Sequence, residues 1–495
     1  MSTSLSEELR SIAKGEIFND EWNRKIYSVD ASHYSLVPLA VAYPTDELDL
    51  QQICQYCFDR NLPSAARGAG TGLLGQSLAN GLVLDFTKHM NRIIEVEEDY
   101  VLVEPGIVKG VLDRELKRRG KFLPPDPASS NYCTIGGMIA NNSGGPHGLL
   151  YGSTIDFIEG LGVVYANGSY HYISDKYSDE DKTIKLLKQL SQHEKVIRVG
   201  FPQVRKNSCG YRLDAVISDK GFCPHKLFAG SEGTLGYVTS AKLKILDLPT
   251  YRHLQVLAFE DLLSAITILP DILSFSPSAV EMLDHSALVT ETNCADRSKG
   301  CLLFVEFASN SLTDLERRSN NCQYRMTRSC TIIETASDEQ SMDRIWAARR
   351  GALNNVMKIT VGSRRPIGLI EDTVVKINFL YDYVIYLQKM YYENKLDFVM
   401  YGHLGDGNIH TRPIVDMDRP EDIRLIQYLA DAVFSQVIKN KGTITGEHGD
   451  GLARVDYIPK LYGEFIFNLF REVKQLFDPG FLLNPGKKFS RVNIH

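Results

Sequence analysis

The sequence has no surplus of positive charge, no long apolar run and no leader-like opening. Its net charge of −6 differs from the basic surplus of nucleic-acid-binding proteins, so we expect no nucleic acid among its partners. No apolar run approaches the ~18–20 residues of a membrane-spanning helix, which predicts no integral membrane segment. The first residues lack the basic and apolar regions of a signal peptide. We therefore expect a cytoplasmic protein, in contact with a membrane only at its periphery if at all.

The cysteines form no regular pattern. There are nine, scattered along the chain, which fits a reducing compartment better than a disulfide framework. Cys54 and Cys57 have CxxC spacing, but they lie in a stretch typical of an amphipathic helix that ends near 61–63. There is no iron–sulfur cysteine run. We expect two buried helix cysteines and no cluster in this chain, whose 495 residues predict two or three domains.

Two glycine-rich blocks contain clustered histidines. His403 and His410 are seven residues apart in GHLGDGNIH, and a flat strand would point their rings to opposite faces. The glycines permit a turn that brings both rings to one point. Glu447 and His448 follow in GEHGDG. His403, His410 and Glu447 match the ligand set of a catalytic zinc or a similar divalent metal, and His448 beside them is a natural general base.

The first glycine loop satisfies a nucleotide-binding pattern without its usual context. Residues 70–75 read GTGLLG, but the next residues contain an Asn-Gly turn signal and then the strand-like 82–86, with no helix between. This excludes a Rossmann site. The loop still offers backbone N–H groups to a pyrophosphate, with Arg67 adding positive charge. Further loops at 124–129, 134–145 and 228–238 are rich in glycine, small residues and amides, so together they suit one extended cofactor.

These motifs resemble a known family. RGAGTG at 67–72, TIGG at 134–137 and GSEGTLG at 230–236 are similar to the FAD-binding loops of vanillyl-alcohol-oxidase-type flavoproteins. The two histidine blocks and LNPGK at 483–487 resemble one branch, which holds D-lactate dehydrogenase, D-2-hydroxyglutarate dehydrogenase and the flavin subunit of glycolate oxidase. The opening YSVDASHY at 27–34 also fits, so the resemblance covers roughly residues 27–489.

The resemblance implies an α+β fold with a two-lobed FAD-binding domain of the PCMH type and an α+β cap. We expect the FAD domain at residues 1–247, the cap with the substrate and metal site at 248–445, and a segment returning to the flavin at 446–495. Within the cap, spacing predicts helices at 259–273 and 313–328 and a buried strand at 301–307. The positions expected at FAD are Arg67, Gly68, Ala69, Gly70, Thr71, Gly72, Pro125, Ser129, Thr134, Gly136, Gly137, Asn141, Ser143, Gly144, Glu232, Gly233, Val238 and Asn484. Positions 68–75 contain no histidine, so we expect non-covalent FAD.

The resemblance also implies a reaction. His403, His410 and Glu447 would hold a divalent metal, zinc or else manganese or iron. The metal would lower the pKa of a substrate hydroxyl. His448 would take the hydroxyl proton while the C2 hydride passes to flavin N5. Arg349 would clamp the substrate carboxylate. Arg412 stands where hydroxyglutarate enzymes have asparagine, and it either binds a second acid group or lies on the solvated surface.

The expected activity is oxidation of a D-2-hydroxy acid, of the D-lactate, glycolate or D-2-hydroxyglutarate type, to the 2-oxo acid. An electron acceptor is then required: a quinone, an electron-transfer flavoprotein, a cytochrome or an iron–sulfur partner subunit. A homodimer is compatible with the sequence. Two alternatives stay open, a non-catalytic flavin- or metal-binding subunit of a larger oxidase complex and an FAD-dependent synthase of the same fold.

Overall fold

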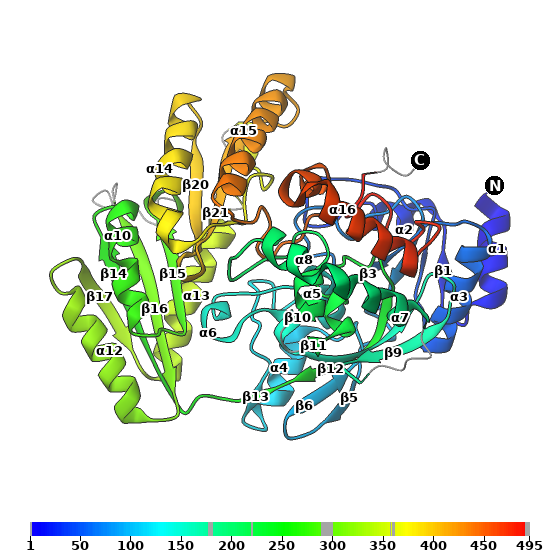
Figure 1. Ribbon diagram of the computed structural model, residues 1–495, viewed down its shortest axis with the longest axis horizontal. Coiled ribbons are helices and arrows are strands. Elements are labelled where there is room, and N and C mark those ends of the chain that lie inside the picture. The colour runs from blue at the N-terminus through cyan, green and yellow to red at the C-terminus, as the bar shows by residue number, and fades with distance from the viewer. Residues whose placement is uncertain are drawn as a thin grey trace.

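The computed structural model describes residues 2–176, 182–218, 221–288, 300–356, 358 and 362–490. Two sheets of four and five strands occupy one half of the molecule, and an eight-stranded sheet occupies the other (Figure 1). The candidate site lies where loops from both halves meet. The fold is mixed α+β, as the sequence predicts.

The four-stranded sheet is built from the N-terminal residues and mixes parallel and antiparallel pairs. Its order is β1-β2-β4-β3, with β2 and β3 both parallel to β4. The loop of residues 68–81 joins two parallel strands, and no helix forms within it, so the Rossmann interpretation is excluded here too. The elements are α1 (Ser2–Ile12), β1 (Ile17–Phe18), α2 (Glu21–Ile26), β2 (Ala40–Ala42), α3 (Glu47–Asp59), β3 (Ser64–Arg67) and β4 (Leu82–Asp85). Cys54 and Cys57 are buried in α3, which confirms the prediction for this pair.

The five-stranded sheet is antiparallel, in the order β5-β6-β12-β8-β9. Its central strand, β12, alternates buried and half-buried residues, because one face packs on the core and the other is partly open. The strands are β5 (Ile93–Val96), β6 (Tyr100–Val103), β8 (Ile158–Val164), β9 (Tyr170–Ser174) and β12 (Tyr237–Lys244). Two strand pairs flank it: β7 (Lys121–Phe122) with β13 (Leu246–Asp247), and β10 (Ile217–Ser218) with β11 (Gly221–Phe222). The helices between β6 and β12 in the chain are α4 (Lys109–Lys117), α5 (Ile135–Asn141), α6 (Gly148–Tyr151), η1 (Thr154–Asp156), α7 (Lys182–Gln189), η2 (Leu190–His193), α8 (Glu194–Gly200), α9 (Leu213–Val216) and η3 (Pro224–Phe228).

The eight-stranded sheet is antiparallel and covered on both faces. Leu303, Val305 and Phe307 of β16 join the core that holds α10 and α12, whereas Phe304 packs with Trp346 of α13 on the other face. This alternation follows from the two-residue period of a strand. The sheet contains β14 (Tyr251–Phe259), β15 (Ala279–Asp284), β16 (Cys301–Ser309), β17 (Thr331–Ala336), β18 (Arg365–Pro366), β19 (Thr373–Val374), β20 (Phe398–His403) and β21 (Asn408–Val415).

The cap helices follow the predicted pattern with one correction. Phe259 belongs to β14, so the predicted helix start at 259 is wrong: α10 begins at Leu262 after Asp261, whose carboxylate caps it by accepting from the Ser264 N–H. Between residues 248 and 445 the helices are α10 (Leu262–Ser274), α11 (His285–Leu288), α12 (Leu312–Met326), α13 (Glu339–Val356), α14 (Ile377–Glu393), η4 (Leu404–Asp406) and α15 (Pro420–Lys439). Two more follow after residue 446, η5 (Val455–Tyr457) and α16 (Ile458–Phe477).

The C-terminal residues return to the N-terminal half. Helix α16 lies over that half in Figure 1, where its Phe470 packs against Phe201 and Tyr211. Beyond it, the Leu482 carbonyl accepts from the Ser64 N–H, and the Asn484 N–H donates to the Ser64 carbonyl. Among the described helices, none has both the length and the apolar character that crossing a bilayer requires. The boundaries at 247 and 445 stay predictions.

Candidate active site

A hairpin brings the first two histidines together. His403 ends β20 and His410 lies in β21, joined by η4 and Gly407. Gly407 has φ +70°, and a Cβ there would lie 2.0 Å from the Val375 carbonyl oxygen, so glycine is required. The imidazole centroids of His403 and His410 are 5.4 Å apart. The turn therefore places both rings at one point, as the glycine spacing predicts.

Three imidazoles converge on one carboxylate oxygen. Glu447 Oε1 lies 2.7 Å from His403 Nε2, 3.8 Å from His410 Nε2 and 4.0 Å from His448 Nε2. His403, His410 and Glu447 are all buried, and His448 is half-buried. Nitrogen and oxygen donors at this spacing, with one of them a carboxylate, suit a borderline divalent cation.

Two buried glutamates face the opposite ring nitrogens. Glu281 Oε1 is 2.6 Å from His403 Nδ1, and Glu371 Oε1 is 2.7 Å from His448 Nδ1. A carboxylate at Nδ1 favours the tautomer with the proton there, which leaves Nε2 free to bind a metal or accept a proton. Burial lowers the pKa of His403, but Glu281 and Glu447 outweigh it and raise that pKa to about 9. Without a metal the ring of His403 is therefore protonated on both nitrogens at neutral pH, and a bound divalent cation would replace the proton on Nε2.

Asp372 fastens the second histidine block. Its carboxylate accepts hydrogen bonds from the backbone N–H groups of Gly446, Glu447 and His448, at 2.9, 3.0 and 2.8 Å. Asp372, His410, Glu447 and His448 each offer a ligand atom within 4.8 Å of the others, whereas His403 lies outside that group of four. We attribute the position of Asp372 to these contacts, because the three backbone N–H groups occupy Oδ2 and the Asn408 side-chain amide donates to Oδ1 at 3.2 Å.

Lys206 connects the Glu447 carboxylate to the glycine loops. Its ammonium is 2.9 Å from Glu447 Oε2, 3.1 Å from the Gly145 carbonyl oxygen and 3.5 Å from Asp406 Oδ2. A buried lysine needs such partners. Burial lowers the pKa of Lys206, but Glu447 and Asp406 outweigh this effect and raise the pKa above its ordinary value. Glu447 is thus held by Lys206 at Oε2 and by His403 at Oε1.

Both predicted substrate arginines are buried beside these histidines. Arg349 forms an ion pair with Glu281, and its Nε has no hydrogen-bond partner among the described residues. Arg412 is 3.2 Å from Glu371 and 2.9 Å from the Tyr401 hydroxyl. Because Arg412 is only 2% exposed, the interpretation as a solvated surface residue is wrong.

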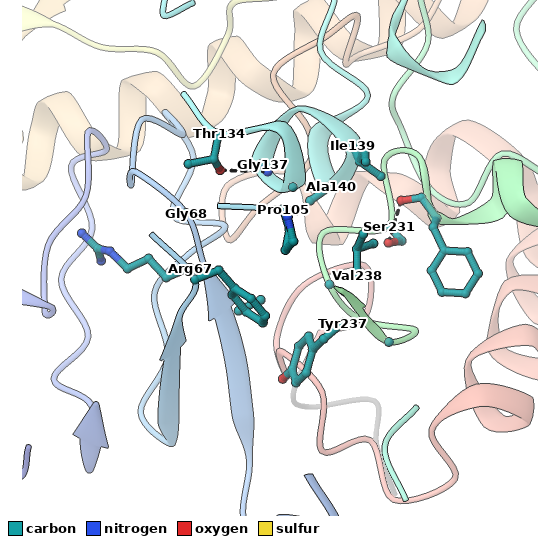
Figure 2. Close-up of a pocket in the computed structure, with 16 residues that line it drawn as sticks. Arg67, Gly68, Pro105, Thr134, Gly137, Ile139, Ala140, Ser231, Tyr237 and Val238 are labelled. Atoms are coloured by element: carbon teal, nitrogen blue, oxygen red, sulfur yellow. Dashed lines mark hydrogen bonds between the residues drawn. The ribbon is translucent and has the colours of Figure 1, made fainter. Parts of the chain in front are cut away.

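A separate cleft is lined in part by the predicted glycine loops (Figure 2). The Thr134 hydroxyl accepts from the Gly137 N–H, which fixes the start of α5 at the wall of the cleft. A Cβ at Gly68 would lie 2.2 Å from Thr134 Oγ1, so the two loops approach closely only with glycine there. Seven predicted cofactor residues line this cleft: Arg67, Gly68, Thr134, Gly136, Gly137, Gly233 and Val238.

The other predicted cofactor positions lie outside that lining, and some brace the loops. Asn484 donates to the carbonyls of Gln76 and Glu232, at 2.8 and 2.7 Å. The Glu232 carboxylate accepts from the N–H groups of Asp450 and Gly451. Gly144 lies against Glu447, since a Cβ there would be 2.6 Å from Oε2. Also outside the lining are Ala69, Gly70, Thr71, Gly72, Pro125, Ser129, Asn141 and Ser143. Their contact with a cofactor stays a prediction.

Sequence reasoning assigned no role to Lys206, Glu281, Glu371 or Asp372. Glu281 carries a usable signal, because a carboxylate inside the apolar strand AVEMLD must be paired when it is buried. Glu371 and Asp372 follow an apolar stretch in the same way. Lys206 carries no such signal, since its partner Glu447 lies 241 residues away.

Comparisons with known proteins agree with this arrangement. The FAD binding domain model matches residues 38–174, and the C-terminal domain model of FAD linked oxidases matches residues 248–488. The chain is 30% identical over 506 residues to the glycolate oxidase subunit GlcD of Bacillus subtilis, covering 99% of this chain and 98% of that one. It is similar in fold to p-cresol methylhydroxylase, with a TM-score of 0.72, 15% identity and coverage of 99% and 98%.

A second group of relatives is longer. The D-2-hydroxyglutarate dehydrogenase of Pantoea ananatis is 30% identical over 511 residues, covering 94% of this chain and 49% of that protein. This chain therefore spans about half the length of that relative.

The predicted FAD fold and the flavoprotein resemblance are confirmed by the two domain models and by the nearly full-length relative. The chain belongs to the family of FAD-linked oxidases, which are oxidoreductases that bind FAD.

Proposed function

We propose that this protein oxidises a D-2-hydroxy acid to the 2-oxo acid, with FAD held non-covalently and a divalent metal held by His403, His410 and Glu447. The observation that carries the proposal is the convergence of three imidazole Nε2 atoms on Glu447 Oε1. The cleft lined by predicted cofactor residues lies in the same molecule, and relatives over nearly the whole chain are named glycolate oxidase subunit GlcD and D-2-hydroxyglutarate dehydrogenase.

Bound FAD supplies the two-electron acceptor, and a bound divalent metal supplies a Lewis acid that lowers the pKa of a hydroxyl group. The chain's own residues handle the proton. Oxidation removes one proton from the substrate hydroxyl and one hydride from C2. His448 Nε2 accepts the proton, because its Nδ1 is already committed to Glu371.

Arg349 is suited to bind the substrate carboxylate. Its guanidinium is buried, and Glu281 occupies one edge while Nε keeps a free N–H among the described contacts. A planar guanidinium can bind two carboxylates along different edges. Arg412 is held by Glu371 and Tyr401, so it contributes positive charge to the pocket wall.

The acceptor that reoxidises the flavin belongs to one of four classes: a quinone, an electron-transfer flavoprotein, a cytochrome or an iron–sulfur partner subunit. One relative is itself named as a subunit, which supports a partner protein. The non-catalytic alternative predicts the same folded site but no reduction of the flavin.

The test is anaerobic titration of the purified flavoprotein with a panel of 2-hydroxy acids. We expect bleaching of the oxidised flavin spectrum and one equivalent of the corresponding 2-oxo acid, identified by mass spectrometry, per flavin reduced. A metal-loaded protein whose flavin stays oxidised with every acid would support the non-catalytic alternative. Removal of the metal with a chelator, followed by its return, is the control.

A further inference from the structure

One carboxylate, that of Glu371, faces two histidines at once. Its Oε1 is 2.7 Å from His448 Nδ1, and its Oε2 is 3.4 Å from His410 Nδ1. The two imidazoles are nearly parallel, with centroids 4.9 Å apart and an angle of 20° between their planes. The contact with His448 is a hydrogen bond, whereas the contact with His410 has an ion-pair distance without hydrogen-bond geometry. Glu371 therefore orients the ring of His448 directly and acts on His410 Nδ1 through its charge.

Glu371 is itself held firmly in place. Arg454 donates to the Glu371 backbone carbonyl at 2.6 Å, and the Arg412 guanidinium lies 3.2 Å from Oε2. The side chain of Glu371 is fully buried. Its neighbour Asp372 adopts a left-handed conformation with φ +66° and fastens the backbone of His448. The pair Glu371–Asp372 thus fixes both the main chain and the ring of His448.

Glu281 is similar in kind but serves only one histidine. It is also fully buried, pairs with an arginine (Arg349) and lies 2.6 Å from a histidine Nδ1, that of His403. The difference is that His403 is a proposed metal ligand alone. Glu371 faces a proposed ligand and the proposed proton acceptor, so the two glutamates form a matched pair for experiment.

We propose that Glu371 is the positioning residue that couples the metal site to proton removal, by orienting the metal ligand His410 and the base His448 together. This inference rests on the proposed function. A neutral imidazole has one N–H, and a carboxylate at Nδ1 retains the proton there and leaves the Nε2 lone pair free. A glutamine at 371 can present its own N–H to Nδ1, which favours the opposite tautomer with Nε2 blocked.

The experiment compares Glu371→Gln with Glu281→Gln. Both are expected to weaken metal binding by about 10–100-fold, the usual effect of losing a carboxylate behind a ligand histidine. Calorimetric titration of the chelator-stripped flavoprotein with Co²⁺ measures this without any turnover. At saturating metal, the remaining defect of Glu281→Gln should lie mainly in KM, because Glu281 also pairs with Arg349, the proposed carboxylate clamp. Glu371→Gln should stay about 10²-fold or more below wild type with KM little changed, because its base is still misdirected.

A double mutant tests the link to His448 directly. In the His448→Ala background, Glu371→Gln should lower kcat by less than about threefold, since two residues acting through one step are not additive. A full additional loss there, or equal kcat for both glutamine variants at saturating metal, would overturn the proposal. If Glu371→Gln does not fold, Glu371→Asp keeps the charge but shortens the reach, and a wild-type kcat in it would also contradict the assignment.

Failure of the proposed function looks different. If the wild-type flavin is not reduced by any acid, the function fails while the Co²⁺ titrations still test the orientation of His410. Unchanged Co²⁺ affinity in Glu371→Gln would then count against the positioning role on its own.

Discussion

His147 joins the two halves of the molecule through charge, and this makes their association sensitive to pH. Its Nδ1 is 2.6 Å from Asp126 in the N-terminal half, and its Nε2 is 3.2 Å from Glu306 in β16 of the eight-stranded sheet. Glu306 also accepts from Arg252 and from the Trp346 indole, at 2.9 and 2.8 Å. Burial lowers the pKa of His147, but the two carboxylates outweigh it and raise the pKa to about 10.

The size of the effect follows from that pKa. An increase from 6.5 to about 10 corresponds to at most ~5 kcal/mol, since a tenfold change in proton affinity is worth about 1.4 kcal/mol. The ring keeps a side-chain exposure of 19%, so water screens part of the interaction. We expect about 2–4 kcal/mol of stabilisation. Because the folded pKa is the higher one, this contribution is complete below pH 6.5 and is lost as the pH rises toward 10.

The assay is the thermal midpoint Tm of the holoprotein, wild type against His147→Gln, from pH 6 to 10. An unfolding entropy of about 2.1 cal/mol/K per residue means that ~1 kcal/mol shifts Tm by about 1 °C in a chain of this length. We expect the Tm of the wild type to exceed that of His147→Gln by about 2–4 °C near pH 6.5 and by much less at pH 10. His225→Gln is the control, because burial lowers the pKa of His225 to about 4 and the ring stays neutral throughout. A Tm difference for His147→Gln that is constant across this range would refute the reasoning.

Three further predictions concern the cofactor, the metal and the substrate. Acid precipitation should release FAD into the supernatant, because residues 68–75 contain no histidine for attachment; flavin remaining in the pellet would show a covalent link. A chelator, or His410→Ala, should abolish substrate-driven flavin reduction while FAD stays bound; full activity in both would show that His410 is not a ligand. Arg349→Ala should lower kcat and raise KM together, since a carboxylate clamp acts in both the ground state and the transition state; an unchanged KM would place the carboxylate elsewhere.

The features predicted best from the sequence were those determined by residues close together in the chain. The glycine spacing around His403 and His410 fixes a hairpin, and the start of the first glycine loop (Arg67 and Gly68) lines the cleft together with the motif at 134–137. Local motifs of this kind can be predicted because glycine and capping residues determine the backbone conformation at their own positions. The absence of a helix after residue 75 could be predicted for the same reason, because the Asn-Gly turn signal lies in the sequence itself.

The features that escaped prediction depend on distant partners. Lys206 and Glu447 meet only because loops from both halves pack together, and nothing near Lys206 indicates it. The two roles of Glu371 depend on the stacking of His410 and His448, which come from separate blocks. A buried carboxylate can be suspected from an apolar surrounding, but its partner is set by the tertiary fold.

Stereochemistry is the most direct test of the proposed chemistry. A fixed flavin face, the metal held by His403, His410 and Glu447, and the carboxylate clamp at Arg349 would define three points around C2. Only one enantiomer can then present its C2 hydrogen to the flavin while His448 takes the hydroxyl proton. The measurement is the stopped-flow rate of flavin reduction with paired D- and L-2-hydroxy acids, in wild type and in His448→Ala. We predict reduction by the D acid alone and a loss of about 10²–10⁴-fold in the variant. Equal rates with D and L acids, or an unimpaired His448→Ala protein, would contradict the account.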